Sequence, residues 1–288
     1  MILDMFGFFY EGGRELPNGF YLFGLQIRFY ALFILTGALL ALFLSSYHAR
    51  KRGYPWDVFD LTFILAFPAG IIGARVWFVI AEWATKFGPN FASDPFAMFR
   101  MWEGGLAIQG GVIGGVLVGV LTVVLRRKGM DPLEACDFVI PTILIAQAIG
   151  RWGNFFNGEV YGQYVSEEAY SFLPSFIINN MPSSSSNIAV PLFIIEALIN
   201  IGGYFILARG LKTVFKDHLK NGDMAFSYFI FYGLVRALLE PLRNAQYIMG
   251  GENNMKSFYM AIAFVIGGVL AIVANHLIRH YLTKKKEA

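Results

Sequence analysis

The chain has 288 residues, of which 56% are apolar and 15% are charged. A soluble domain carries about a quarter charged residues, so this composition excludes an ordinary water-soluble protein. The net charge of +3 is small, and the basic residues cluster in short loops, which disfavours nucleic-acid binding. A single cysteine, Cys136, excludes an intramolecular disulfide, and nothing marks it as a metal ligand.

Seven apolar segments approach or exceed the roughly 18 residues that cross ~30 Å of hydrocarbon. They predict an all-α polytopic membrane protein with seven transmembrane helices, in one integral membrane domain over residues 1–288. The fourth segment is short and ends in a glycine-rich stretch, so it is a candidate for a broken or incomplete crossing. The segments are Phe23–Tyr47, Val58–Trp83, Gly104–Leu125, Asp137–Gly150, Val190–Ala208, Met224–Leu242 and Phe258–Ile278.

Lys and Arg residues follow every second segment. Fourteen of the 23 come after the first, third, fifth and seventh segments, and the opposite loops hold only four. The positive-inside rule therefore predicts an outside N-terminus and a cytoplasmic C-terminus. The fourteen are Arg50, Lys51, Arg52, Arg126, Arg127, Lys128, Arg209, Lys212, Lys216, Lys220, Arg279, Lys284, Lys285 and Lys286.

Five arginines do not fit this loop pattern, because each lies in or at the end of an apolar segment. Snorkelling to the outer interface is one interpretation of Arg28 and Arg243, and it suits the others less well. Arg236 lies twelve residues into a helix that starts at Met224, which puts it ~18 Å from the cytoplasmic face at 1.5 Å per residue. The five are Arg28, Arg75, Arg151, Arg236 and Arg243.

The predicted helix directions bring several polar side chains together in the outer half of the bilayer. Guanidinium groups in apolar surroundings suit a phosphate, because each presents a planar fork of donors and stays charged. A phosphate at this depth most naturally belongs to a phospholipid headgroup. Simpler interpretations are that Arg236 pairs with Glu240 four residues on, or that Arg75 neutralises a glutamate. The outer set is Tyr30, Arg75, Gln109, Arg151, Glu196 and Glu240.

The stretch from Gly150 to Gly162 packs one arginine, two asparagines, one glutamate and four glycines into thirteen residues. Polar groups at a membrane boundary are costly unless a cavity, partner or ligand satisfies them, which favours a site over a simple connector. Its aromatic residues are interpreted as interface anchors; they are Trp152, Phe155 and Phe156.

Two further segments have open interpretations. The glycines around Gln109 favour either close helix packing or a backbone opened to a ligand. Residues 160–189, which include the run Ser183–Ser186, are too long for a simple turn. They are expected to form an extracytoplasmic arm that helps receive a peptide, or a disordered loop. A transporter is disfavoured, because the glycine-rich stretch has no second copy.

The glycine-rich stretch resembles the signature of the bacterial prolipoprotein diacylglyceryl transferase family. Residues 150–159 read Gly-Arg-Trp-Gly-Asn-Phe-Phe-Asn-Gly-Glu and follow the family pattern Gly-Arg-x-Gly-Asn-Phe-x-Asn-x-Glu without a gap. The similarity covers nearly the whole chain, and the seven-helix, N-out topology is the family's too. Further matching blocks are Ile27–Tyr30, Gly73–Arg75, Trp102–Leu106, Asp137–Phe138 with Pro141, and Phe231–Arg236 with Glu240 and Arg243.

The resemblance implies a reaction at the outer leaflet of the bacterial plasma (inner) membrane. The diacylglyceryl group of phosphatidylglycerol passes to the lipobox cysteine of a prolipoprotein, and glycerol phosphate is released, with no cofactor and no metal. By position, Arg151 resembles the phospholipid-binding arginine and Arg236 the second essential one. The candidate catalytic residues are Arg151, Arg236, Tyr30, Gln109 and Glu159; the candidate phosphatidylglycerol-binding residues are Arg151, Arg236, Asn154, Arg75, Glu240, Gly104 and Gly105.

One departure from the family pattern bears on mechanism. The family usually has histidine where this chain has Gln109, and its other histidine before the fifth segment is replaced by Val190. Glutamine has no useful basicity, so it cannot take the thiol proton. Three interpretations follow: the arginines lower the pKa of the incoming cysteine, a carboxylate such as Glu159 or Glu240 acts as base, or the protein is a weakened or inactive lipid-binding paralogue.

Overall fold

The computed structural model describes residues 6–10, 16–55, 57–83, 88–100, 105–126, 131–184, 186–244 and 255–287. Gly104 and the side chain of Gln109 therefore lie outside the described residues. The chain forms two compact units. The larger unit comprises Met1–Phe43 and Cys136–Ala288, and the smaller unit comprises Leu44–Ala135. The expectation of a single integral membrane domain stays a prediction.

Six helical segments in the described residues are long and apolar enough to cross a membrane. A seventh apolar helix, Gly110–Arg126, is shorter. The protein is thus mostly helical and multi-pass, while the count of seven crossings and the orientation stay predictions. The six spans are Phe29–Lys51, Asp57–Glu82, Pro132–Asn157, Leu192–Phe215, Asp223–Leu242 and Ser257–Lys285.

The first helix begins six residues later than predicted, because the chain before it forms a sheet. Strands β1 (Phe6–Phe9), β2 (Gly19–Leu22) and β3 (Leu25–Arg28) pair antiparallel in that order. Phe23 and Gly24 connect β2 to β3 with φ of 52° and 79°, and two left-handed residues give a tight turn that matches strand twist. Helix α1 (Phe29–Lys51) follows directly. The all-α expectation is therefore wrong here.

The fourth span is longer than predicted at both ends. It runs through α5 (Pro132–Val139), a 3-10 turn η3 (Ile140–Thr142) and α6 (Ile143–Asn157). The turn contains Pro141, which lacks an N–H for the helical ladder. The helix then continues through the glycine-rich stretch, because Gly158 rather than Gly150 ends it, in a left-handed conformation with φ of 67°.

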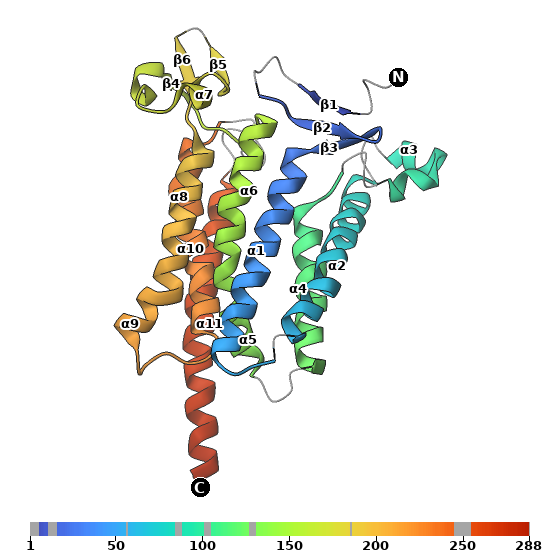
Figure 1. The fold of residues 1–288 in the computed structure, drawn as a ribbon. Helices are drawn as coiled ribbons and strands as arrows, with labels where there is room; N and C mark the ends of the chain where they lie inside the picture. The colour runs from blue at the N-terminus through green and yellow to red at the C-terminus, as the bar shows by residue number, and fades with distance from the viewer. Residues whose placement is uncertain are drawn as a thin grey trace. The chain divides into compact units, whose positions relative to one another are not determined.

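The remaining helices of the larger unit pack in pairs, α6 against α8 and α10 against α11 (Figure 1). Helix α8 (Leu192–Phe205) continues through the π-helical turn η5 (Ile206–Gly210) into α9 (Leu211–Phe215). Helix α10 (Asp223–Leu239) is followed by the 3-10 turn η6 (Glu240–Leu242), and α11 spans Lys256–Glu287. Asp137 accepts hydrogen bonds from the backbone N–H groups of Gly222 and Ala225, which fixes the start of α10.

In the smaller unit, α2 (Asp57–Glu82) packs against α4 (Ile108–Arg126). Two short helical elements, α3 (Gly88–Ser93) and η1 (Pro95–Phe99), follow α2. The α2–α4 contact depends on glycine: a Cβ on Gly110 would lie 2.1 Å from the carbonyl oxygen of Gly73. Close packing therefore accounts for Gly110, one of the two interpretations given to the glycines around Gln109.

The segment after α6 is folded, so its interpretation as a disordered loop is wrong. Strands β4 (Tyr164–Ser166), β6 (Asn187–Ala189) and β5 (Ser183–Ser184) form an antiparallel sheet in that order. The 3-10 turn η4 (Glu167–Tyr170) and α7 (Ser175–Ile178) lie between β4 and β5. We call residues 160–189 the arm.

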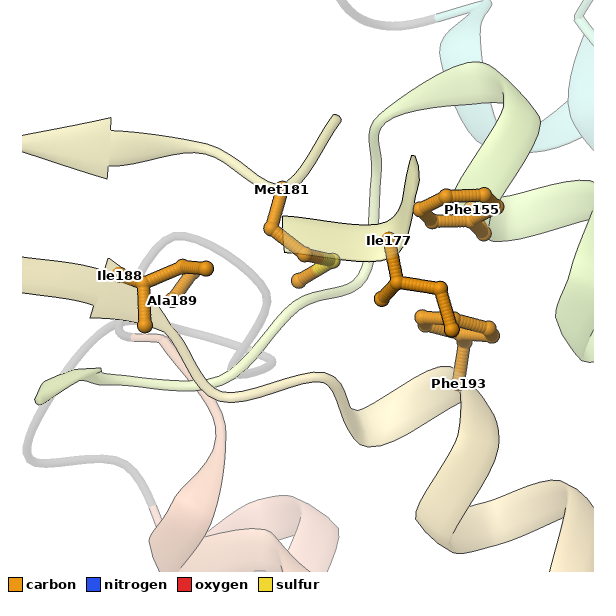
Figure 2. Close-up of a cluster of buried hydrophobic side chains, with 6 residues drawn as sticks. All are labelled: Phe155, Ile177, Met181, Ile188, Ala189 and Phe193. Carbon is orange, nitrogen blue, oxygen red and sulfur yellow. The ribbon is translucent and has the colours of Figure 1, made fainter. Parts of the chain in front are cut away.

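An apolar cluster joins the arm to α6 and α8, as Figure 2 shows. Phe155 of α6 and Phe193 of α8 stack with ring centroids 4.5 Å apart, and Ile177 of α7 packs beside them. Phe155 is only 3% exposed, so its interpretation as a membrane-interface anchor is wrong. Burial of this side chain contributes about 2 kcal/mol and fixes the arm to the end of the two helices.

Candidate functional site

Five charged side chains form a row of alternating sign in the larger unit. Arg151 of α6 pairs with Glu196 of α8, and the other oxygen of Glu196 accepts a 2.9 Å hydrogen bond from Arg243. Arg243 lies 3.8 Å from Glu240, which in turn lies 3.2 Å from Arg236. We call Arg151, Glu196, Arg243, Glu240 and Arg236 the ion-pair row.

The helices account for this arrangement. Arg151 lies near the end of α6, and Glu196 lies in the second turn of its antiparallel neighbour α8. Arg236 and Glu240 are four residues apart at the end of α10 and the start of η6, so they share one helical face. Arg243 is the extended residue that directly follows η6. The expected Arg236–Glu240 pair is confirmed, but it is part of a larger set.

Exposure differs sharply along the row. The side chains of Glu196, Arg243 and Glu240 are 6%, 6% and 9% exposed, whereas Arg151 and Arg236 are 24% and 23% exposed. The two end arginines can therefore meet a ligand, and the central three cannot do so readily. Three guanidinium groups against two carboxylates leave one positive charge, which favours an anionic ligand.

Part of the row lacks hydrogen bonds. Both carboxylate oxygens of Glu240 and the Nε of Arg243 are buried without a hydrogen-bond partner in the described part of the chain. The 3.2 Å and 3.8 Å separations are close enough for ion pairing, but the groups are not aligned for hydrogen bonding. A buried unsatisfied carboxylate is costly, so this half of the row is the less stable of the two.

The end of the glycine-rich stretch presents a second polar group. The Oε1 of Glu159 accepts hydrogen bonds from the amides of Asn154 and Asn157, at 3.4 Å and 3.2 Å. The left-handed Gly158 turns the chain back so that this carboxylate reaches over the last turn of α6. Tyr30 packs against Gly153, where a Cβ would lie 2.9 Å from its ring, and lies near both Glu159 and Arg151.

A small cavity lies between this turn and the arm. Its volume is about 10 Å³, and its lining includes Asn154, Glu159, Tyr161, Asn180 and Phe193. This is the lower limit for a single water molecule. Asn180 is 2% exposed and accepts a hydrogen bond from the Leu16 N–H, so it ties the N-terminal segment to the arm.

The base of the arm is bonded directly to the row. Gly162 forms a β-bridge with Arg243, and the N–H of Gln163 donates to the carbonyl of Leu242. The N–H of Gly162 donates to the carbonyl of Val190 just before α8. A Cβ on Gly162 would lie 2.6 Å from Val190 and 2.7 Å from the Leu242 oxygen, so only glycine permits this approach.

Arg75 and Gly105 belong to the smaller unit and contact each other. Arg75 is 7% exposed and donates to the carbonyl oxygens of Ala97, Met98 and Gly105, at 2.6, 2.8 and 2.9 Å. Gly105 has φ of +73°. These bonds hold the segments on either side of residues 101–104 to α2. A part for Arg75 and Gly105 in lipid binding stays a prediction, and Gly104 and the Gln109 side chain fall outside the described residues.

Sequence reasoning missed the central position of Arg243. Snorkelling to the interface is wrong for this residue, because its side chain is 6% exposed and bonded to Glu196. One sequence signal pointed to a shared site: Arg243 follows Arg236 by seven residues and Glu240 by three. This is the spacing of residues on one face of a helix. Glu196 was one of two glutamates, with Glu240, that Arg75 was thought to neutralise, and no pattern in its own segment indicates which arginine it binds.

The helices and the ion-pair row define a multi-pass membrane protein with a partly buried, net positive site at one end of the larger unit. A family model described as prolipoprotein diacylglyceryl transferase matches residues 17–274. The chain therefore belongs to the prolipoprotein diacylglyceryl transferase family, and it is a transferase of the diacylglyceryl class. The resemblance seen in the glycine-rich stretch is confirmed.

Curated relatives carry a common name, phosphatidylglycerol–prolipoprotein diacylglyceryl transferase. The relative from Streptococcus equi subsp. equi is 37% identical over 261 residues, which cover 90% of this chain and 95% of the relative. Those from Clostridium novyi and Lactococcus lactis subsp. cremoris are 34% and 36% identical, over 91% and 88% of this chain and 96% and 92% of their own lengths.

Proposed function

We propose that this chain transfers the diacylglyceryl group of phosphatidylglycerol to the lipobox cysteine of prolipoproteins and releases glycerol phosphate. The observation that carries the proposal is the pair of accessible guanidinium groups, Arg151 and Arg236, at the two ends of one buried ion-pair row. The names of the relatives, which specify phosphatidylglycerol and prolipoprotein, support this choice of substrates.

In the proposed reaction the cysteine thiolate attacks the glyceryl carbon that bears the phosphate. A carbon–sulfur bond forms, the carbon–oxygen bond to phosphate breaks, and the electron pair leaves with the phosphate oxygen. The leaving group gains charge in the transition state, where fixed donors contribute most. Arg151 contacts Glu196 through its Nε, and in this proposal its two terminal nitrogens donate to the phosphate together with the guanidinium of Arg236.

The nucleophile must lose a proton before attack. Nearby cations lower the pKa of a thiol, so the net positive row favours the thiolate of the incoming cysteine. Two carboxylates are alternative proton acceptors: Glu159, which is fixed by Asn154 and Asn157 beside Tyr30, and Glu240. In this proposal, Asn154 and Tyr30 orient the group that accepts the proton.

The same proposal places the reaction at the outer leaflet of the bacterial plasma membrane, with the N-terminus outside. The distribution of the cations supports this orientation. The folded arm, which is bonded to Gly162 and packed on α6 and α8, stands beside the site and would receive the lipobox peptide. The lipid reaches the arginines from the bilayer, so both substrates meet without leaving the membrane surface.

The test is transfer of a labelled diacylglyceryl group from phosphatidylglycerol to a lipobox peptide by the purified protein. The parent should form the thioether, and Arg151→Ala and Arg236→Ala should each lose about 100-fold or more in rate. Arg100→Ala is the control, because this half-buried arginine pairs with Asp94 in the smaller unit. Activity that survives both site substitutions would refute the proposed site.

A second candidate function is lipid binding without turnover, which is favoured by one observation, the glutamine at position 109. The comparison is between the parent and Gln109→His in the same transfer assay. Equal activity in the two proteins shows that no imidazole is needed. A parent that binds phosphatidylglycerol without forming product, together with an active histidine variant, would establish the second candidate instead.

A further inference from the structure

Arg243 is the least exposed arginine of the ion-pair row. It lies beside both glutamates of the row, each of which also pairs with one of the other two arginines. It is 5% exposed as a residue and donates to Glu196, which also pairs with Arg151. It faces Glu240, which also pairs with Arg236. A ligand that binds Arg151 and Arg236 therefore weakens one ion pair of Glu196 and one of Glu240. Arg243 is then the remaining arginine partner of both carboxylates.

The two halves of the row differ in how well they are bonded. On the Glu196 side, each carboxylate oxygen has its own arginine. On the Glu240 side, a single oxygen lies between Arg236 at 3.2 Å and the Nε of Arg243 at 3.8 Å. That Nε and both oxygens of Glu240 lack hydrogen bonds in the described chain. Both residues are more than nine-tenths buried, so water offers little compensation.

Glu240 and a lipid phosphate would compete for the same guanidinium. Glu240 Oε2 lies 3.2 Å from a terminal nitrogen of Arg236, so a phosphate that takes the full fork of donors must displace this carboxylate. If Glu240 moved away without a new partner, a buried carboxylate would be left unpaired, which is strongly unfavourable. The unsatisfied Nε of Arg243, on the far side of Glu240, offers that partner.

We propose that Arg243 is a positioning residue that takes up Glu240 when an anionic headgroup binds Arg236. This inference rests on the proposed function and adds a step to it. Before lipid binds, Glu240 neutralises Arg236; on lipid binding the carboxylate turns to Arg243, and Arg236 becomes available to the phosphate. Arg243 itself does not touch the lipid, and Glu196 keeps Arg151 and Arg243 in place throughout.

The proposal predicts an unusual double-mutant pattern. In Arg243→Gln, Glu240 has only Arg236 as partner, so it blocks the headgroup site, and the Kd for phosphatidylglycerol should rise about tenfold or more. Adding Glu240→Gln removes the competitor, so the double variant should bind at least about threefold more tightly than Arg243→Gln. Glu240→Gln alone also lacks the competitor, so its Kd for phosphatidylglycerol should be lower than that of Arg243→Gln.

The measurement is equilibrium binding of phosphatidylglycerol to the detergent-solubilised protein, with phosphatidylcholine as a lipid without net charge, followed by kcat and KM for transfer. Because binding is read separately from turnover, a failure of the proposed reaction does not disguise the result. The matched control is the pair Arg100→Gln and Asp94→Asn, an arginine–carboxylate pair of the smaller unit, for which neither Kd nor KM should change.

A double variant that binds phosphatidylglycerol as weakly as Arg243→Gln, or more weakly, would overturn the proposal, because Arg243 would then be a direct ligand or a purely structural group. If Arg243→Gln does not fold, Arg243→Lys replaces it, with and without Glu240→Gln. Lysine keeps the charge but lacks the Nε and the rigid fork. Adding Glu240→Gln to Arg243→Lys should therefore also tighten phosphatidylglycerol binding, and unchanged or weaker binding would overturn the proposal.

Discussion

Glu196 shows how much depends on a single residue of the row. Its two oxygens bind two arginines from different segments, Arg151 and Arg243, and its side chain is 6% exposed. Removing one member of a buried ion pair leaves an uncompensated charge. Glu196 therefore fixes the position of Arg151, the arginine proposed to bind the lipid, and contributes to the stability of the helix ends around it.

We expect Glu196→Gln to lower the free energy of unfolding by about 3 kcal/mol or more, since Arg243 would lose its hydrogen-bonded counter-ion. Thermal unfolding in detergent measures this change. The exposed arm residue Glu167 is the control, and Glu167→Gln should unfold within about 0.5 kcal/mol of the parent. Equal stability of the two variants would show that the pair with Glu196 contributes little.

At the scale of elements, the approach of α1 to α6 depends on two glycines. A Cβ on Gly37 of α1 would lie 2.9 Å from the backbone oxygen of Ala146, and one on Gly153 of α6 would lie 2.9 Å from the ring of Tyr30. Tyr30 and Arg151 are thus kept close by backbone packing. Gly150, on the same helix as Gly153, has open space where its Cβ would be.

The two α6 glycines give a matched pair of substitutions. Gly153→Ala should displace the Tyr30 ring and cost about 1–3 kcal/mol of stability, the usual effect of overpacking. Gly150→Ala should be neutral or slightly stabilising, because alanine suits a helix better than glycine. Detergent unfolding curves measure both, and a Gly150→Ala variant that is the less stable of the two would contradict this account of the packing.

The sequence predicts the bounds of some of these elements better than others, because different physical factors set them. Hydrocarbon thickness sets the length of an apolar helix, so the long spans could be placed within several residues. The β2–β3 turn at Phe23 and Gly24 was hidden in an apolar run that looks helical. Two glycines of the same stretch, Gly150 and Gly158, could each end α6, and only the structure shows that Gly158 does so in a left-handed conformation.

The candidate site was predictable to a similar extent. Helix directions brought Arg151, Glu196 and Glu240 to one level, and the structure joins them through ion pairs. The Arg236–Glu240 pair was predictable from its spacing, but the partners of Glu196 were not, because Arg243 looks like an interfacial residue unless Glu196 is known to face it. The placement of Arg75 relative to the row, and the side chain of Gln109, remain sequence-based predictions.

For the whole molecule, the main prediction concerns orientation. With Cys136 replaced by serine, a cysteine introduced at Ser184 of the arm should react with a membrane-impermeant maleimide in intact cells. A cysteine at Thr283 near the end of α11 should react only after permeabilisation. Both positions are exposed, so access alone decides the labelling. The reverse pattern would place the arm and the site on the cytoplasmic side.

The central claim is that Arg151 and Arg236 hold one phosphate between them. A structure of the protein with phosphatidylglycerol bound tests this most directly. It should place headgroup oxygens within about 3 Å of both guanidinium groups, with Glu240 turned toward Arg243. A headgroup bound elsewhere, with Arg151 and Arg236 still paired only to their glutamates, would contradict the account.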